Sequence, residues 1–222
     1  PYILPKARAG YRMGNGELID SMLNEALLDA FDGCHMGITA ERVASQYGIS
    51  REEQDAFAAL SQQKAQQALA DNRFVEEIVP VEITDKKGQV SLFETDEYPR
   101  AGVTKESISA LSPAFQKEGS VTAANASGIN DGAAAVLLMS DEKAEALGLQ
   151  PLAQILGSAS TGVDPSVMGL GPISAVQKAV DRAGISLEQI DLIELNEAFA
   201  AQSLAVCQAL SLKQEIVNVN GG

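Results

Sequence analysis

One stretch decides the fold of this chain, and it reads Asp191-Leu192-Ile193-Glu194-Leu195-Asn196-Glu197-Ala198-Phe199-Ala200-Ala201. Its first half holds a short apolar run from Leu192 to Leu195, which is typical of a buried parallel strand. Its second half opens a run from Ala198 to Leu210 that is apolar on nearly every side, as expected of a helix inside a protein. The stretch therefore predicts a strand that passes directly into a buried helix.

Asn196 lies at the change from strand to helix. Ligands of open α/β sheets bind outside the carboxyl ends of the strands, so this position favours a functional residue. Its neutral side chain carries an NH2 donor and a carbonyl acceptor. Such a group can direct a hydrogen bond, or a held water, at a developing oxyanion. The alternative is a helix N-cap, a position that Asn also favours, and position alone leaves both roles open.

The composition excludes several classes of protein. The chain has 222 residues, of which 45% are hydrophobic, so a sizeable core can form. The formal net charge of −14 and the lack of a basic stripe argue against nucleic-acid binding. No apolar run nears the length of a membrane span, and no signal-peptide pattern opens the chain. Two distant cysteines, Cys34 and Cys207, indicate free thiols in a reducing compartment, so we expect a cytoplasmic location.

The first part of the chain is rich in predicted helix. Apolar residues recur at helical spacing from Leu18 to Phe31, and Gly33 is placed to end that helix. A second, short helix is predicted over residues 39–47. Ser50-Arg51-Glu52-Glu53 fits a capping box and opens a long helix that reaches about Asp71.

A hairpin and a loop follow these helices. Residues 78–83 are extended in pattern, and Pro80 places them at an edge. Asp85-Lys86-Lys87-Gly88 reads as a turn, which makes a hairpin plausible. Residues 96–119 are expected to be mostly loop with one short helical piece.

After Ser120 the predicted elements alternate. Helices are expected at 141–147, 172–183 and 198–210, and strands at 134–139, 154–158, 192–195 and 216–219. This alternation predicts a parallel α/β sheet. The pattern stops at Gly221-Gly222 without a covering helix, so we expect the chain to be a fragment that is poorly soluble or partly unfolded.

Three motifs resemble the thiolase family. Asn196-Glu197-Ala198-Phe199-Ala200 is similar to the NEAFA block of thiolases, and Val217-Asn218-Val219-Asn220-Gly221-Gly222 to the stretch before the family's catalytic histidine. The run from Ser120 to Ala134 resembles the family's substrate-contacting loop. His35-Met36-Gly37 points to the biosynthetic acetyl-CoA acetyltransferase subgroup. Leu195 and Ala124 depart from the family pattern, which often has a smaller residue at each position.

The resemblance implies a thiolase-like α/β fold in three parts. Residues 1–119 resemble the helix-rich loop domain that is inserted into the first thiolase half and contacts coenzyme A. Residues 120–149 resemble the end of that half, and residues 150–222 the start of the second half, which is truncated. The family's nucleophilic cysteine lies upstream of this chain and its histidine downstream, so we expect the fragment alone to be inactive.

The resemblance also assigns site residues. Asn196 becomes the catalytic residue, acting through a water on an oxyanion. Substrate contact is carried onto Leu27, His35, Met36, Arg100, Ser107, Phe115, Ala123, Ala126, Ser127, Gly128, Met168, Ala198 and Phe199.

Each assignment has an ordinary structural alternative. The only histidine, His35, could be structural rather than part of the pantetheine tunnel. The small residues from Asn125 to Gly128 suit the thin pantetheine arm of coenzyme A, and the Ser127 hydroxyl could bond an amide, yet they also suit an ordinary turn. Arg100 could bind phosphate or adenine, or be a solvated surface arginine. Glu197 could orient the site or interact with a helix dipole.

The implied reaction is the thiolase condensation of two acetyl-CoA molecules to acetoacetyl-CoA and coenzyme A, and its reverse. No cofactor is implied, because coenzyme A esters are the substrates. Nor do two cysteines and one histidine make a metal site with recognisable spacing. A homo-oligomer, dimer or tetramer, is expected for the whole enzyme, with no nucleic-acid or membrane partner. A longer-chain 3-ketoacyl-CoA thiolase and a non-catalytic module for CoA binding or oligomerisation stay open as alternatives.

Overall fold

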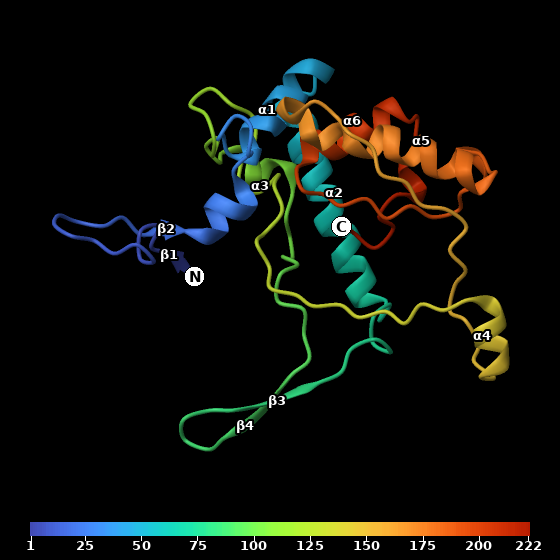
Figure 1. The fold of residues 1–222 in the computed structure, drawn as a ribbon. Helices are drawn as coiled ribbons and strands as arrows, with labels where there is room; N and C mark the ends of the chain where they lie inside the picture. The colour runs from blue at the N-terminus through green and yellow to red at the C-terminus, as the bar shows by residue number, and fades with distance from the viewer.

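A computed structural model describes all residues from Pro1 to Gly222. Helices α1 (Met36–Tyr47), α2 (Arg51–Ala70) and α6 (Ala200–Ala209) pack together, with the turn η2 (Pro165–Leu170) and α5 (Gly171–Ala183) beside them (Figure 1). Elements from both ends of the chain therefore build one common body.

The hydrophobic core lies where α1, α6 and η2 meet. It contains Val43, Ala44, Ile49, Leu170, Ala201 and Ala205. Ala201 and Ala205 lie one helical turn apart on α6, and their small side chains let α1 approach closely. Only 28 of the 222 residues are buried, so most of the chain lies outside this core.

The helix boundaries of this body follow the predicted signals. The Ser50 hydroxyl accepts the Glu53 N–H at 3.2 Å, and the Glu53 carboxylate accepts the Ser50 N–H at 2.7 Å, which completes the predicted capping box of α2. Gly48, at φ 64°, ends α1 in the left-handed conformation that glycine adopts without strain. Helix α5 ends at Gly184 in the same way.

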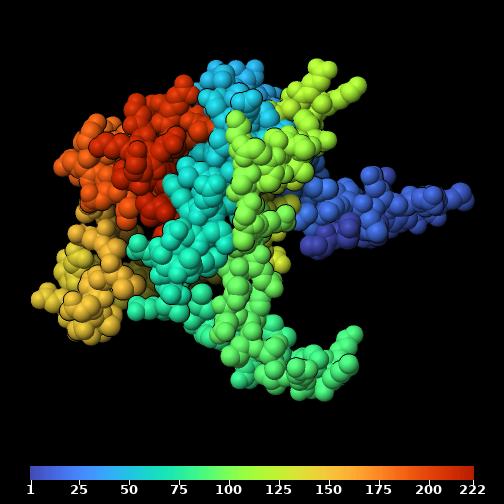
Figure 2. Space-filling view, turned by 180° about the vertical axis from the view of Figure 1, so that it is seen from behind, coloured from blue at the N-terminus to red at the C-terminus, as the bar shows by residue number.

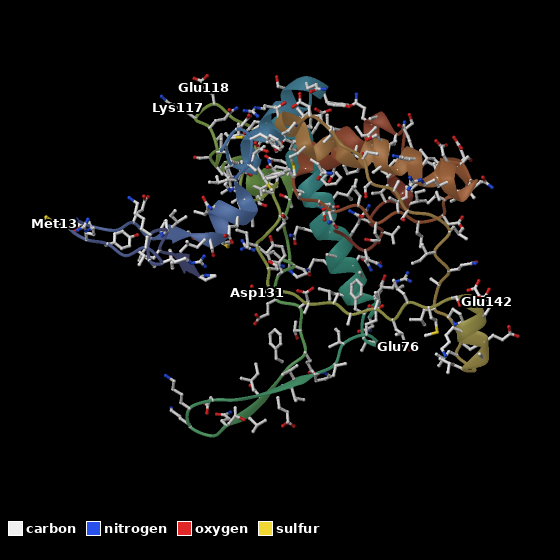
Figure 3. The ribbon with its side chains drawn as sticks, in the orientation of Figure 1. Met13, Glu76, Lys117, Glu118, Asp131 and Glu142 are labelled. Carbon is white, nitrogen blue, oxygen red and sulfur yellow. The ribbon has the colours of Figure 1, made fainter.

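Several segments project from the body. The strands β1 (Tyr2–Ile3) and β2 (Ile19–Asp20) pair to form an N-terminal arm, and β3 (Val81–Thr84) and β4 (Val90–Phe93) form the predicted hairpin. Figure 2 shows both standing away from the packed helices. Met13 marks the tip of the arm, and Glu142 lies on the separate helix α4 (Asp141–Ala146) (Figure 3).

The remaining elements are short. Helix α3 (Lys105–Ser109) is the predicted helical piece within the loop region. The 3₁₀ turns η3 (Leu187–Gln189) and η4 (Gln214–Ile216) flank α6 in sequence. No helix combines the length and apolar character needed to cross a membrane.

The predicted helix from Leu18 to Phe31 is wrong in most of its length. The structure has strand β2, then a single wide turn of π-helix, η1 (Leu23–Leu27). Leu18 and Phe31 are 64% and 81% exposed. An amphipathic helix draws most of its stability from packing of its apolar face, and no other element covers this face.

The predicted parallel sheet is also wrong. Residues 134–139 and 154–158 form no strand, and the expected strands at 192–195 and 216–219 are reduced to one parallel bridge between Ile193 and Val217. The only sheets are the two antiparallel pairs. A strand needs a hydrogen-bonding neighbour, and the apolar runs at 134–139 and 154–158 find none among these residues.

Candidate active site

Asn125 fixes the loop that follows Ser120. It is 3% exposed, and its Nδ2 donates to the Asp55 carboxylate at 2.9 Å and to the Ser120 carbonyl at 3.1 Å. Its Oδ1 accepts the Thr122 N–H at 2.7 Å. Both N–H donors and the carbonyl oxygen of this buried amide are engaged inside the loop or on α2, so the loop has one well-defined shape.

Glu41 anchors the start of the same loop. Its buried carboxylate accepts the Ser120 N–H, the Ser120 hydroxyl and the Val121 N–H, each at 2.8 Å. Gln54 of α2 donates to the Ser120 hydroxyl at 2.9 Å. Because bonds to a charged acceptor are stronger than neutral ones, α1 and α2 together hold the loop firmly.

The held loop pairs with the segment that leads into α6. The Ser127 N–H donates to the Ala198 carbonyl at 3.0 Å, and the Ala200 N–H donates to the Asn125 carbonyl at 2.9 Å. Ala126 and Phe199 form an antiparallel bridge between these bonds. Four predicted contact residues, Ala126, Ser127, Ala198 and Phe199, therefore meet although they come from segments far apart in the sequence.

An aromatic row extends this meeting point. The His35 ring stacks on Phe115 with centroids 4.6 Å apart, and Phe115 meets Phe199 edge-on at 6.1 Å. The Phe115 ring also lies against Gly37, where any side chain would collide with it. Two more predicted residues, His35 and Phe115, thus join the same site and give it an apolar wall.

His35 also has a structural role. It is the N-cap of α1, and its Nδ1 accepts the Gly37 N–H at 3.0 Å. Partial burial lowers the pKa of His35 below its ordinary value. Both effects favour the neutral ring, with its remaining proton on Nε2. Cys34 is a free thiol and makes no hydrogen bond to His35.

Asn196 is exposed, and its side chain makes no hydrogen bond within the chain. The N-cap of α6 is Phe199, the helix begins at Ala200, and no side chain caps it. The N-cap alternative for Asn196 is therefore wrong. Its amide is left free to meet a ligand, a few residues before the paired segment at Ala198.

Asn218 and Glu197 complete the surroundings of Asn196. Asn218 is 2% exposed and bonds to the backbone of Leu195 on one side of Asn196 and to the Glu197 carboxylate on the other. Glu197 precedes the first turn of α6, so it orients this segment rather than the helix end. Sequence reasoning quoted the motif that contains Asn218 without giving the residue a role.

Comparison with known families decides the broader assignment. Residues 1–142 match the thiolase N-terminal domain, and residues 149–222 match the thiolase C-terminal domain. The chain belongs to the thiolase family.

The similarity to individual thiolases extends over the whole chain in both sequence and structure. Acetyl-CoA acetyltransferases of Pseudomonas aeruginosa and Syntrophomonas wolfei are 60% and 59% identical to the whole chain, which spans 56% and 57% of their lengths. The crystal structure of the Bacillus anthracis acetyl-CoA acetyltransferase superposes with a TM-score of 0.92 at 49% identity, covering all of this chain and 56% of that one. Human mitochondrial 3-ketoacyl-CoA thiolase also gives 0.92, at 42% identity and the same coverage.

Other residues that the thiolase resemblance selected lie apart from this meeting point or are already engaged. Arg100 is exposed, with its backbone N–H on Gln62 and no ion pair for its guanidinium. The Ser107 hydroxyl is used in the capping box of α3 with Thr104. Met168 lies on η2 and is 39% exposed.

Four further selected residues lie along the flanks. Leu27 ends η1 and Met36 begins α1, both half-buried. Ala123 is exposed on the loop held by Asn125. Gly128 is exposed too, and the Tyr98 ring occupies the space that a side chain would need.

A well-formed hollow lies elsewhere on the molecule. It has a volume of about 740 Å³ between the end of α2 and the base of the β3–β4 hairpin, with the acidic residues Glu94, Asp96, Glu97 and Asp131 among its lining. Repulsion by these carboxylates makes it a poor place for a polyanionic CoA ester. We therefore place the candidate site at the loop and the aromatic row.

Proposed function

We propose that this chain forms part of an acyltransferase that condenses two acetyl-CoA molecules to acetoacetyl-CoA and coenzyme A, and catalyses the reverse thiolysis. The family membership and the printed names of the acetyl-CoA acetyltransferase relatives support this proposal. The observation that carries it is the unbonded Asn196 side chain beside the paired loop at Ala126 and Phe199.

Asn196 is proposed to act on negative charge. Thioester condensation passes through an enolate and a tetrahedral oxyanion, and both are stabilised by donors aimed at the oxygen. Asn196 supplies a neutral NH2 group, directly or through a held water. A neutral donor suits this role because it introduces no charge of its own before the reaction begins.

The loop and the aromatic row are proposed to hold the pantetheine arm. Ala126 and Ser127 leave space for a narrow chain, and Ser127 is exposed, so its hydroxyl can reach an amide of the ligand. His35, Phe115 and Phe199 supply an apolar wall. Arg100, which has no ion-pair partner, is proposed for the phosphate or adenine end.

The test uses an active enzyme that contains this sequence. Residues 1–222 replace the aligned segment of the Pseudomonas aeruginosa relative, and acetoacetyl-CoA thiolysis is measured with Asn196→Ala and Asn196→Asp. Loss of a direct oxyanion donor lowers turnover by roughly 10²- to 10³-fold, and loss of a water-mediated one by less. Asp should be at least as damaging as Ala, because it places negative charge where negative charge develops.

Two results separate the possible failures. A chimera without thiolase activity, in a folded state, would contradict the proposed reaction. An active chimera in which Asn196→Asp turns over normally would contradict the role of Asn196 alone. Ser127→Trp tests the loop, because a bulky ring there should raise the Michaelis constant for the CoA ester while the melting temperature stays unchanged.

A longer-chain 3-ketoacyl-CoA thiolase is the second candidate. The close superposition on human mitochondrial 3-ketoacyl-CoA thiolase favours it. Comparing the thiolysis of acetoacetyl-CoA with that of a long 3-ketoacyl-CoA by the same chimera distinguishes the two. We propose the acetyl-specific reaction because the acetyltransferases have the higher sequence identities.

The 222-residue chain by itself is proposed to be inactive in thiolysis. Cys207 is buried, its pKa is raised by burial and by Glu197, and neither cysteine pairs with His35. Turnover by the purified chain that is abolished by Cys34→Ser would contradict this. The three-part division at residues 119 and 149, the cytoplasmic location and the homo-oligomer of the whole enzyme stay predictions.

A further inference from the structure

We propose that Asn218 is a positioning residue that sets the direction of the Asn196 side chain. The inference rests on the proposed function for its catalytic consequence, but its structural content does not. The C-terminal stretch that contains Asn218 ends beside α2 (Figure 1). The Asn218 side chain bonds to Leu195 and Glu197 and makes no hydrogen bond to the Asn196 side chain. It acts on the backbone on both sides of Asn196.

Only two backbone hydrogen bonds join Ile193 to the segment of residues 216–218. The Ile193 N–H donates to the Ile216 carbonyl, and the Asn218 N–H donates back to the Ile193 carbonyl, both at 2.9 Å. Asn218 then adopts φ 45°, in the left-handed region, so its main chain turns away from the ladder. If the backbone pairing continued, the next backbone hydrogen bonds would hold Leu195, but the backbone makes no such bonds.

The Asn218 side chain supplies the hydrogen bonds to Leu195 that the backbone lacks. Its Oδ1 accepts the Leu195 N–H at 2.8 Å, and its Nδ2 donates to the Leu195 carbonyl at 2.7 Å. A side-chain amide carries the same donor and acceptor as a peptide group, so it can imitate a neighbouring strand. Aspartate lacks the donor, and alanine lacks both groups.

A third hydrogen bond joins Asn218 to the residue that follows Asn196. Asn218 Nδ2 also donates to Glu197 Oε1 at 2.8 Å. Leu195 and Glu197 are therefore both held by one buried amide, while Asn196 between them keeps a free, exposed side chain. The direction of the Asn196 Cα–Cβ bond follows from its fixed neighbours, without any contact to its amide.

Helix α2 bonds both to the segment around Asn218 and to the loop of the candidate site. We call the three side-chain bonds of Asn218 to Leu195 and Glu197 the Asn218 clamp. Lys64 Nζ donates to the Val217 carbonyl at 2.9 Å, and the Gly222 N–H donates to the Ser61 hydroxyl at 3.2 Å. The same helix carries Asp55, which holds Asn125. The Asn196 segment and the loop at Ser127 are thus both held in position by the same rigid helix. This matters because displacement of a catalytic group by about 1 Å can lower a rate 10²-fold.

The structural arm of the test uses the full-length chimera. Amide hydrogen exchange at Leu195 is compared in the unaltered chimera, Asn218→Ala and the matched control Asn220→Ala, whose parent side chain makes no hydrogen bond. Exchange at Leu195 should rise by about fivefold in Asn218→Ala, since loss of a hydrogen bond of about 1 kcal/mol changes an equilibrium by that factor, and should stay unchanged in the control. Unchanged exchange in a folded Asn218→Ala chain would overturn the proposal.

Asn218→Asp covers the case in which Asn218→Ala fails to fold. Aspartate can still accept the Leu195 N–H, but it loses both donations and faces the Glu197 carboxylate. Exchange at Ala200, the next amide after Glu197 that donates a hydrogen bond, should then rise more than exchange at Leu195. Equal protection at both amides would overturn the proposal.

The catalytic arm is a double-mutant cycle in the active chimera. Asn218→Ala should lower turnover about tenfold or more, with the Michaelis constant little changed, and should add less than about twofold once Asn196→Ala is present, because residues that act as a unit are not additive. Independent, multiplicative losses would mean a merely structural role and would overturn the catalytic consequence. If Asn196→Ala itself leaves turnover unchanged, the proposed catalytic role of Asn196 is contradicted. The exchange data alone then test whether Asn218 positions the Asn196 segment.

Discussion

The helical body and the projecting segments use similar apolar sequences with opposite results. In the body, Val43, Ala201 and Val206 are 0–1% exposed, because α1 and α6 cover one another. In the segment between the loop and α5, Val136, Leu137 and Leu152 are 82%, 81% and 106% exposed. An apolar pattern thus reports a tendency to be buried, and burial follows only where a second element lies within reach.

Polar contacts divide the molecule in the same way. Glu41, Asp55 and Asn125 form a buried network that joins α1 and α2 to the loop after Ser120. The projecting hairpin and α4 make no hydrogen bond to the packed helices and are held by bonds to nearby residues, such as the Ser140 cap of α4 and the Gln154 bond to Asp141. The comparison predicts that the two regions differ in stability, and four experiments test this from the largest expected effect to the smallest.

Hydrogen exchange should separate the regions most clearly. Backbone amides of α1 and α2 should exchange roughly 10³-fold more slowly than those of residues 129–139, because core elements open only on global unfolding. Exchange followed by mass spectrometry of peptic fragments measures both regions in one sample. Similar rates throughout would contradict the comparison, because they would mean that the helical body does not exist as a stable unit.

Glu41→Gln should destabilise the body by about 3 kcal/mol. The substitution removes a charged acceptor that serves Ser120 and Val121 and puts an NH2 group opposite their donors. The matched control is Glu52→Gln on α2, where the parent side chain is 81% exposed and should contribute within about 0.5 kcal/mol. Chemical denaturation measures both variants, and equal midpoints would show that the buried network adds no stability.

Loss of a helix cap should depend on the region. Ser50→Ala removes the cap of α2 and should lower the global stability by about 1 kcal/mol. Ser140→Ala removes the cap of α4, which stands apart from the body, and should leave the main melting transition in place. A shift of that transition by Ser140→Ala as large as that of Ser50→Ala would show that α4 is coupled to the core.

The smallest effect concerns the pH dependence of His35. Burial lowers its pKa in the folded state, so below its ordinary pKa the unfolded state takes up a proton more readily. This contribution to stability is complete above the unfolded-state pKa and declines as the pH falls through it toward the folded-state pKa. The melting temperature should therefore fall between about pH 7.5 and about pH 5.5, on either side of the ordinary histidine pKa.

The matched variant for this effect is His35→Asn. Asparagine can still cap α1 but does not titrate, so the decline over this pH range should be smaller. An equal decline in both proteins would assign it to groups other than His35.

Most helices and the β3–β4 hairpin were predictable, and the strands of the parallel sheet were not. The signals for α1, α2 and α5 lie within each helix, in Ser50, Gly48 and Gly184, and the structure confirms them. The strand predictions at 134–139 and 154–158 needed partners that an apolar run does not specify, so they are wrong.

The candidate site was predicted in part. The residues that meet at Ala126 and Phe199 were named from motifs, but their meeting depends on contacts between distant segments. The roles of Glu41 and Asn218 were missed, because a buried carboxylate or amide looks like any polar residue until its partners are known. The available signal was an asparagine directly after the apolar pair Ile216-Val217, since asparagine tolerates the left-handed conformation that Asn218 adopts.

The short ladder at Ile193 and Val217 has a consequence for the order of folding. The bond between Leu195 and Asn218 closes a loop of only 23 residues around α6, whereas the bond between Ser61 and Gly222 spans 161. Closing the longer loop from the open chain costs about 2 kcal/mol more in chain entropy. We expect α6 and its flanking segments to form a nucleus early, while the attachment of the chain end to α2 comes late and limits the rate.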